Sequence, residues 1–539
     1  MKKLTVKLFI VVITLTASFA IGCQEKKIEK KRPNILFAIS DDQSFPHTSF
    51  AGSKFVNTPA FDRVAKEGVF FTKCYAGSPG CAPSRSAIVT GRHHWQNEQS
   101  GQHASSWMKK YIPFVDELAA NGYAIGRTTK GVGPFQYARN ENDSLWRAEN
   151  AAGPAYDLVS YNETNDERFA SGIVNANYAE NFKYFLDSIR GDKPFFYWFG
   201  CKEPHLVYEQ GSWKRRGKKL EEAEVPGFLP DNEVIRGDLL DYAVEIEWFD
   251  LHLQRMLEYL EEIGELDNTI VIVTSDNGMP LPRAKANCYD YGVHVPMAIR
   301  YPKEIQGDRI SETPVSFIDL APTILEITQT KPQKMLPITG KSIWDLLKSG
   351  KENKDRVVYA GRERHSSSRY QNWGYPQRCV RKGDYLYIWN AIPNRWPAGA
   401  PQGINPKTGK LNPLYDLFDD ETKIGENVFS DIDQSPSKQF LIKNNNNPEV
   451  SEYFHLSVDK RPEFELFNVT TDMDCLNNLA GKEEYSAIEK DLTQTLFDEL
   501  KRTNDTRMTV EEFGTFDTYK RYSPMRSYPK PESEKEIEN

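Results

Sequence analysis

The chain has 539 residues, of which 39% are hydrophobic and 12% aromatic, and its formal net charge is −8. This composition is typical of a folded globular protein and argues against long disorder, while the length predicts two domains. The acidic balance argues against a broad nucleic-acid-binding surface, although a local cluster of cations can still bind an anionic substrate.

The first 23 residues have the pattern of an export signal. Lysines at positions 2, 3 and 7 precede an apolar run over residues 8–21 that is too short to span a bilayer. The run ends in Ala20-Ile21-Gly22-Cys23, which resembles a bacterial lipobox with Cys23 as the lipidated residue; an ordinary cleaved signal peptide is the alternative. The sequence predicts an exported protein held by a lipid anchor to a bacterial membrane, which we expect to be the outer one, facing the periplasm or the cell surface. Residues 24–32 form a charged tether, and no other segment is long enough for a membrane span.

Apolar segments alternate with helical patterns from residue 33 to 348. We expect buried strands over residues 33–40, 195–199 and 269–274, and a further strand that begins at Tyr123. We expect helices over residues 58–67 and 239–260, and a further helix that ends at residues 121–122. Thr58 is the expected N-cap of the first helix, with Pro59 at its first position. Uniformly apolar strands between helices indicate an α/β domain with a large, mostly parallel sheet covered on both faces.

The pattern changes beyond residue 349. Strand-like segments at 357–360 and 385–389 alternate with loops rich in Pro, Gly and Asn, and a last helix is expected near 485–501. We expect residues 349–510 to form a smaller antiparallel sheet with a helix, followed by a polar tail over 511–539. The seven cysteines show no Cys-x-x-Cys pair and do not support a disulfide framework.

Acidic residues follow two of the expected strands. Asp41 and Asp42 come directly after the first, and Asp276 and Asn277 after the strand at 269–274. Ligands of open α/β sheets bind at the carboxyl ends of strands, and oxygen donors from two such ends suit a hard divalent cation. Either pair taken alone is equally consistent with a turn or a helix cap.

The segment Cys81-Ala82-Pro83-Ser84-Arg85, followed by Thr90-Gly91-Arg92, resembles the mark of the formylglycine-dependent sulfatases. Segments at 58–68 and 465–480 are also similar to that family, so the resemblance extends from about residue 33 to 480 in the expected order. A buried structural cysteine before a helix is the alternative interpretation of Cys81. The resemblance implies an alkaline-phosphatase-like sulfatase fold, with the catalytic domain at 33–348 and a substrate-contacting subdomain at 349–510.

The resemblance also implies the site. Cys81 would be oxidised to formylglycine (3-oxoalanine) by a formylglycine-generating enzyme or an anaerobic sulfatase-maturating enzyme, and its hydrate would attack sulfur. The resemblance further implies that Asp41, Asp42, Asp276 and Asn277 bind Ca²⁺, with Cys81 in reach. Arg85 would anchor the hydrate and Asp276 would activate it. Lys285 would bind the sulfate, and His205 would protonate the leaving group.

One segment departs from the family pattern. Members usually have Gly-Lys-x-His after the strand that begins near Tyr123, whereas this chain has Thr128-Thr-Lys-Gly-Val-Gly-Pro134. Aligned on Val-Gly-Pro, the histidine position is Gly131 and the lysine position is Thr129, with Lys130 beside it. We expect Lys130 to reach the sulfate, and the missing histidine is either replaced from elsewhere, for example by His103, or dispensed with.

The expected substrate is a sulfated carbohydrate. Residues 287–292 and the order of the C-terminal motifs look most like the sulfamidase branch, whose bacterial members include enzymes for O-sulfated algal polysaccharides. Arg364 and His365 are the candidate substrate contacts, since arginines bind sulfates and carboxylates through paired hydrogen bonds; a solvated charged surface is the alternative. Three functions stay open. They are an O-sulfatase for algal polysaccharides such as ulvan or for glycosaminoglycans, a sulfamidase, and a phosphatase or phosphonate hydrolase of the same superfold. A non-enzymatic binding protein is the most remote alternative.

Overall fold

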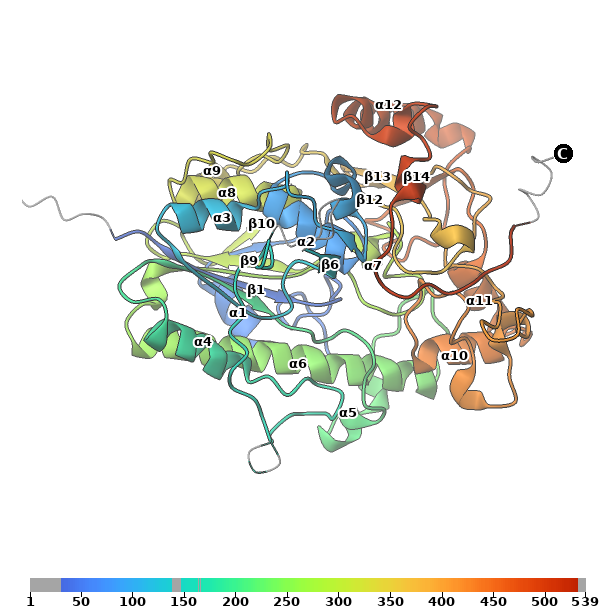
Figure 1. Ribbon diagram of the computed structural model, residues 1–539, viewed down its shortest axis with the longest axis horizontal. Helices are drawn as coiled ribbons and strands as arrows, with labels where there is room; N and C mark the ends of the chain where they lie inside the picture. The colour runs from blue at the N-terminus through green and yellow to red at the C-terminus, as the bar shows by residue number, and fades with distance from the viewer. Residues whose placement is uncertain (1–30, 138–146, 163, 165, 532–539) are drawn as a thin grey trace, which may run out of the picture. The chain divides into compact units, whose positions relative to one another are not determined.

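A seven-stranded mixed sheet forms the centre of the computed structural model, which describes residues 31–137, 147–162, 164 and 166–531 (Figure 1). Its strands, in spatial order, are β10 (Arg309–Ser311), β2 (Val69–Phe71), β9 (Met297–Arg300), β8 (Thr269–Ser275), β1 (Asn34–Ser40), β7 (Phe195–Gly200) and β5 (Ala124–Thr129). Strands β8, β1, β7 and β5 run parallel, whereas β9 is antiparallel to both of its neighbours. The predicted mostly parallel sheet is confirmed.

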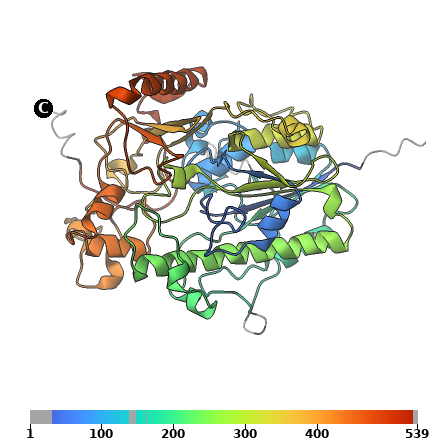
Figure 2. The same cartoon turned by 180° about the vertical axis from the view of Figure 1, so that it is seen from behind.

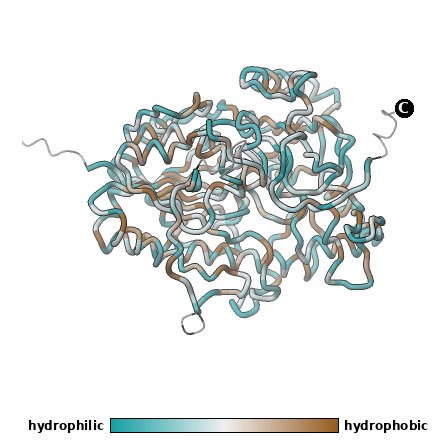
Figure 3. Tube along the Cα trace, in the orientation of Figure 1, coloured by the Kyte–Doolittle hydropathy of each residue, from teal (hydrophilic) through white to brown (hydrophobic). Residues whose placement is uncertain are grey.

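Helices cover both faces of this sheet (Figure 2). One face carries α2 (Cys81–Thr90), α3 (Phe114–Ala120), α8 (Leu320–Ile327) and α9 (Trp344–Ser349), and the other carries α1 (Pro59–Lys66), α4 (Tyr178–Ser188) and α6 (Glu233–Glu262). Strand β1 packs against both helix layers. Ile35, Phe37 and Ile39 face the layer that contains α2, and Leu36 and Ala38 face the layer that contains α6. Alternate residues of a strand point to opposite faces, so a strand buried on both sides is apolar throughout. Figure 3 shows apolar residues gathered along these central strands.

Helix α1 begins as predicted, with Thr58 as N-cap residue and Pro59 in the first turn. The Thr58 side chain does not cap the helix, however. Instead, the buried carboxylate of Asp250 from α6 accepts hydrogen bonds of 2.8 Å from the backbone N–H groups of both Ala60 and Phe61. A carboxylate at a helix N-terminus satisfies N–H groups that have no partner within the helix.

The second sheet is antiparallel, with strands in the order β12-β13-β14-β15. These strands are β12 (Val358–Arg362), β13 (Gln377–Lys382), β14 (Tyr385–Asn390) and β15 (Phe464–Asn468), and α12 (Ser486–Arg502) packs on them through Leu492, Leu496 and Leu500. The predicted smaller sheet with its helix is therefore present. The remaining elements are the paired strands β3 (Cys74–Tyr75) with β11 (Val315–Ser316) and β4 (Ser105–Ser106) with β6 (Phe135–Gln136), and the helices α5 (Ser212–Arg215), α7 (Asp290–Val293), α10 (Pro436–Lys443), α11 (Ser451–Val458) and α13 (Thr515–Thr518).

Contacts group the chain from Pro33 onward into one compact unit. The segment expected to be a polar tail packs on this unit as far as residue 531, because its aromatic side chains Phe516 and Tyr528 are buried. Among the described residues, no helix is both long enough and apolar enough to cross a membrane. The described cysteines are all unpaired. The predicted signal, Cys23 and nearly all of the tether lie outside the described residues.

Candidate active site

Four neighbouring parallel strands, β5, β7, β1 and β8, end at the same edge of the large sheet. The chain runs from β5 into Lys130, from β7 into the loop of His205, from β1 into Asp41 and from β8 into Asp276. This is the edge at which open α/β sheets bind ligands. The fold thus gathers candidate residues from four segments that are far apart in the sequence.

Three carboxylates form a buried cluster at this edge. One oxygen from each of Asp41, Asp42 and Asp276 lies within 4.8 Å of the other two, and the three residues are at most 1% exposed. Oδ1 of Asp41 and Oδ1 of Asn277 are buried, and neither has a hydrogen-bond partner among the described residues. Buried acceptors without partners are unfavourable, and an all-oxygen set of donors is what Ca²⁺ prefers. The residues present therefore fit the metal that the resemblance implies.

Cationic side chains surround the cluster. Arg85 Nε donates to Asp276 Oδ2 at 2.6 Å, Lys285 Nζ donates to Asp42 Oδ2 at 2.6 Å, and Lys130 Nζ pairs with Asp41 Oδ2. Burial opposes the ionisation of Asp41, but the charges of Lys130, His205 and Arg85 outweigh it and hold the pKa of Asp41 well below its usual range. At Asp276 the effect of burial outweighs that of Arg85 and raises the pKa of the carboxyl.

Cys81 is the first residue of helix α2, and Gly80 before it is extended. The Cys81 Sγ atom lies 4.0 Å from Asp42 Oδ1 and is buried. Burial raises the pKa of the thiol far above its ordinary value, so an unmodified Cys81 is a neutral thiol at physiological pH. The residue stands where backbone N–H groups at the helix start favour an anion.

Arg85 lies one turn further along α2 and is fully buried. Besides its bond to Asp276, its Nη1 donates to the backbone carbonyls of Lys130 and Gly131 at 3.1 and 3.2 Å. Its Nη2 has no hydrogen-bond partner in the part of the chain that the structure describes, and lies 3.9 Å from Asp41 Oδ1. A buried guanidinium N–H without a partner is available to an anionic ligand.

Lys130 and Thr129 are the two residues that could match the sulfate-binding lysine of the family, and their side chains lie in different places. The Lys130 side chain lines the central cavity and pairs with Asp41, whereas both the backbone N–H and the hydroxyl of Thr129 bond to Asp157 Oδ1. Lys130 therefore lies in the cavity beside Asp41, and its contact with the sulfate stays a prediction.

No side chain fits at Gly131. A Cβ atom built there would lie 2.3 Å from Oδ1 of Asn150. That amide is fixed in place, because it accepts from Val132 N at 2.9 Å and donates to Val132 O at 3.1 Å. A histidine at this position would require the loop of Asn150 to move. His103 lines the same cavity as Cys81, and its buried Nδ1 has no hydrogen-bond partner among the residues described.

Lys285 and His205 both lie beside Oδ2 of Asp42. Lys285 Nζ bridges Asp42 Oδ2 at 2.6 Å and Asp433 Oδ2 at 2.8 Å. His205 Nδ1 is 2.7 Å from the carbonyl oxygen of Leu206, and its Nε2 is 3.8 Å from Asp42 Oδ2. With Nδ1–H donating to that carbonyl, Nε2 is the nitrogen that faces the acidic cluster.

The two candidate substrate contacts lie in different surroundings. The rings of His365 and His103 are tilted by 45° with their centroids 5.2 Å apart, and a Cβ built on Gly80 would lie 3.0 Å from His365 Nδ1, so His365 stands beside Cys81. Arg364 is 2% exposed, and its guanidinium donates to the carbonyls of Tyr519 and His103 and to a serine hydroxyl. Arg364 thus holds the backbone of His103, and neither residue 364 nor 365 lines the central cavity among the described residues.

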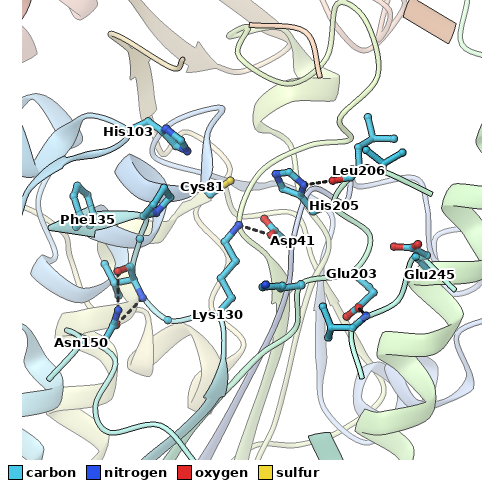
Figure 4. A pocket seen from close by; sticks show the side chains of 18 of the residues that line it. Asp41, Cys81, His103, Lys130, Phe135, Asn150, Glu203, His205, Leu206 and Glu245 are labelled. Carbon is cyan, nitrogen blue, oxygen red and sulfur yellow. Dashed lines mark hydrogen bonds and ion pairs between the residues drawn. The ribbon is translucent and has the colours of Figure 1, made fainter. Parts of the chain in front are cut away.

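The central cavity has a volume of about 580 Å³ (Figure 4). Cys81, Lys130 and His205 point into it from three sides, with Asp41 between them, and the far wall includes the α6 residue Glu245. Sequence reasoning missed Asp433 and Glu245, because neither follows a strand nor belongs to a motif. Only their tertiary contacts bring them to the site.

The fold and the site define a hydrolase of the alkaline-phosphatase-like α/β type. The family model "Sulfatase" matches residues 33–330, which is more than half of the chain. The chain is 26% identical over 489 residues to an ulvan-active sulfatase of Formosa agariphila, covering 86% of this chain and 74% of that protein. It is 25% identical over 401 residues to human N-sulphoglucosamine sulphohydrolase, covering 67% and 74%. A solved structure of a protein in complex with its substrate D-glucosamine-2-N,6-O-disulfate has a TM-score of 0.59 at 19% identity, over 88% of this chain and 99% of that one.

The chain belongs to the sulfatase family. It is a sulfuric ester hydrolase, and its relatives include an ulvan-active sulfatase and an N-sulphoglucosamine sulphohydrolase.

Proposed function

We propose that this protein hydrolyses sulfate esters of oligosaccharides derived from a sulfated polysaccharide, either an algal one such as ulvan or a glycosaminoglycan. The proposal includes a formylglycine made from Cys81 and a Ca²⁺ ion held by the acidic cluster and Asn277. One observation carries it: Cys81, at the start of a helix, lies 4.0 Å from a buried three-carboxylate cluster that is surrounded by cationic side chains. The similarity to an ulvan-active sulfatase supports the substrate class.

The chain's own groups have distinct tasks in this proposal. When present, the formylglycine hydrate supplies the attacking hydroxyl and Ca²⁺ polarises the sulfate. Arg85 anchors the attacking hydrate, and Lys130 and Lys285 neutralise charge on the oxygens of the sulfate. Asp276 accepts the proton of the attacking hydroxyl, and His205 Nε2 donates one to the leaving oxygen of the sugar.

The test is a substrate panel with purified protein whose residue 81 has been checked by peptide mass. The panel contains p-nitrophenyl sulfate, p-nitrophenyl phosphate, a p-nitrophenyl phosphonate ester, ulvan oligosaccharides, glucosamine N-sulfate and glucosamine-2-N,6-O-disulfate. We expect release of inorganic sulfate only from protein that carries formylglycine, and loss of release in the Cys81→Ala and His205→Ala variants. Formylglycine-bearing protein that cleaves phosphate or phosphonate esters faster than sulfate esters, with bound zinc, would instead support the hydrolase alternative of the same superfold.

A sulfamidase is the second candidate function, favoured by the similarity to human N-sulphoglucosamine sulphohydrolase. N-sulfate and O-sulfate cleavage require the same nucleophile, metal and sulfate-binding cations, so the site chemistry is common to both. The panel separates them: glucosamine formed from glucosamine N-sulfate identifies a sulfamidase, whereas sulfate released from ulvan oligosaccharides identifies an O-sulfatase.

We also propose that the protein is exported and held to the outer membrane of a bacterium through a lipid on Cys23. The lipobox-like Ala20-Ile21-Gly22-Cys23 supports this. Metabolic labelling with a fatty acid should mark the wild type and not a Cys23→Ala variant, and the wild type should fractionate with membranes. Oxidation of Cys81 further requires a formylglycine-generating or anaerobic sulfatase-maturating enzyme as a partner.

A further inference from the structure

A carboxylate from the C-terminal half lies beside the proposed catalytic acid. Asp433 precedes helix α10 by three residues and belongs to no motif. Its Oδ2 accepts a 2.8 Å hydrogen bond from Lys285 Nζ, the ammonium that also donates to Asp42 Oδ2. One oxygen of Asp433, one oxygen of Asp42 and one ring nitrogen of His205 all lie within 4.8 Å of one another.

Exposure separates this group into an inner and an outer part. The side chains of Lys285 and Asp42 are 2% and 0% exposed, whereas those of Asp433 and His205 are 26% and 35% exposed. Asp433 and His205 therefore form an accessible rim above the buried pair. Within the described part of the chain, Lys285 bonds to Oδ2 of Asp433, which leaves Oδ1 available to a ligand.

A second metal ion is a poor explanation of this arrangement. Asp42, His205 and Asp433 have the composition of a metal site, but the Lys285 ammonium lies between the two carboxylates, within 2.8 Å of each. Its charge balances them, and its Nζ already occupies the bridging position that a metal ion shared by Asp42 Oδ2 and Asp433 Oδ2 would need. The free carboxylate oxygen is thus better suited to a neutral hydrogen-bond donor.

We propose that Asp433 determines substrate specificity by accepting a hydrogen bond from the sugar substituent next to the scissile sulfate. The inference rests on the proposed function, in which His205 protonates the leaving oxygen. That oxygen lies in hydrogen-bond reach of His205, and a ring nitrogen of His205 is within 4.8 Å of an Asp433 oxygen, so a substituent on the neighbouring carbon is within reach of Asp433. A hydroxyl or an N–H group there is recognised, whereas a second sulfate or a carboxylate meets a like charge and is rejected.

The experiment compares Asp433→Asn, Asp433→Ala and wild type on two probes: p-nitrophenyl sulfate, which has no neighbouring donor, and the saccharide of the panel that the wild type cleaves fastest. The asparagine side chain introduced by Asp433→Asn is matched in size, and its amide oxygen keeps the hydrogen bond to Lys285. We expect kcat/KM for the saccharide to fall roughly 10- to 100-fold, mainly through KM, as for the loss of a charged hydrogen bond. Turnover of p-nitrophenyl sulfate should change less than about threefold.

A third probe tests the sign of the interaction. The same saccharide with a second sulfate on the neighbouring carbon should be a poor substrate of the wild type and a relatively better one of Asp433→Asn. The surface variant Asp459→Asn, whose side chain is 51% exposed, is the control and should behave as wild type.

The outcomes are distinct. An equal fall on both probes in Asp433→Asn would assign Asp433 a structural role in holding Lys285 and overturn the inference, as would an unchanged kcat/KM for the saccharide. Formylglycine-bearing wild type that cleaves no sulfate ester would overturn the proposed function, and the inference with it.

Discussion

At the scale of single residues, Lys130 offers the sharpest test of the site. Its ammonium pairs with Asp41 inside the cavity, while Thr129 bonds to Asp157 instead. We predict that Lys130→Ala lowers kcat/KM by roughly 100- to 1,000-fold, because a positioned cation that stabilises transition-state charge is lost. Thr129→Ala should stay within about threefold of wild type. If Lys130→Ala remains fully active while Cys81→Ala and His205→Ala are inactive, Lys130 does not act on the sulfate.

His103 is the residue-scale candidate for the histidine that Gly131 cannot supply. It lines the cavity with Cys81, and its Nδ1 has no partner in the described part of the chain. Burial keeps the pKa of the imidazole well below its ordinary value, so the ring is neutral and offers an unprotonated nitrogen as a hydrogen-bond acceptor to the attacking group. We predict that His103→Ala lowers kcat by roughly 100-fold with a smaller change in KM. Steady-state kinetics on p-nitrophenyl sulfate measure this, with His455→Ala as the surface control. An unchanged kcat would mean that the histidine function is dispensed with.

The sequence predicted these residues to different extents for a physical reason. Cys81 and Arg85 lie in one helical turn, so a short motif records their relation. Asp433 is brought to Lys285 by contacts between positions 148 residues apart, and no local pattern records that. The sequence shows that glycine stands at position 131, where a histidine is expected. It does not show that the side-chain amide of Asn150 lies 2.3 Å from the place of a Cβ atom at that position.

At the scale of elements, Asp250 of α6 joins that helix to the start of α1. Burial raises the pKa of this carboxyl from 3.8 to about 7. Because the folded-state pKa lies above the unfolded one, this group's stabilisation is complete below about pH 4 and is lost as the pH rises through 7. We predict that the free energy of unfolding of the wild type, relative to that of Asp250→Asn, falls over that pH range by roughly 4 kcal/mol at most, because each pKa unit corresponds to about 1.4 kcal/mol. Urea unfolding at several pH values measures the difference, and a pH-independent gap would contradict the prediction.

The elements themselves were largely predictable because burial imposes local patterns. Apolar runs predicted β1, β7 and β8, and spacing of three and four residues predicted most of α6. The short strand β10 carries too few residues for such a pattern, and its parallel pairing with β2 depends on contacts distant in sequence. Residues 511–531 bury two aromatic side chains and bond to Arg364, Arg395 and Ser367, and the polar composition of the segment conceals these contacts.

At the scale of the whole molecule, the proposed metal site connects parts of the chain that are distant in sequence. Asp41 follows the first strand, Asp276 follows β8, and Lys285 extends the cluster to Asp433 in the C-terminal half. A ligand that stabilises this cluster therefore acts on global unfolding and not only on one loop. This coupling makes thermal stability a readout of metal binding that needs no substrate and no formylglycine.

We predict that a chelator lowers Tm and that Ca²⁺ restores it, by an amount equivalent to about 2.7 kcal/mol when the ion is at 100 times its Kd. Ca²⁺ should restore more stability than Mg²⁺, because the larger ion is coordinated well by several protein carboxylate and amide oxygens, whereas Mg²⁺ usually keeps several water ligands. Asp41→Asn should lose the response to Ca²⁺, since the Asp41 carboxylate offers a buried Oδ1 that has no hydrogen-bond partner among the described residues. Differential scanning calorimetry with and without chelator measures this, and Asp459→Asn is the control at the surface. An equal Tm under all conditions would show that these oxygens hold no stabilising ion.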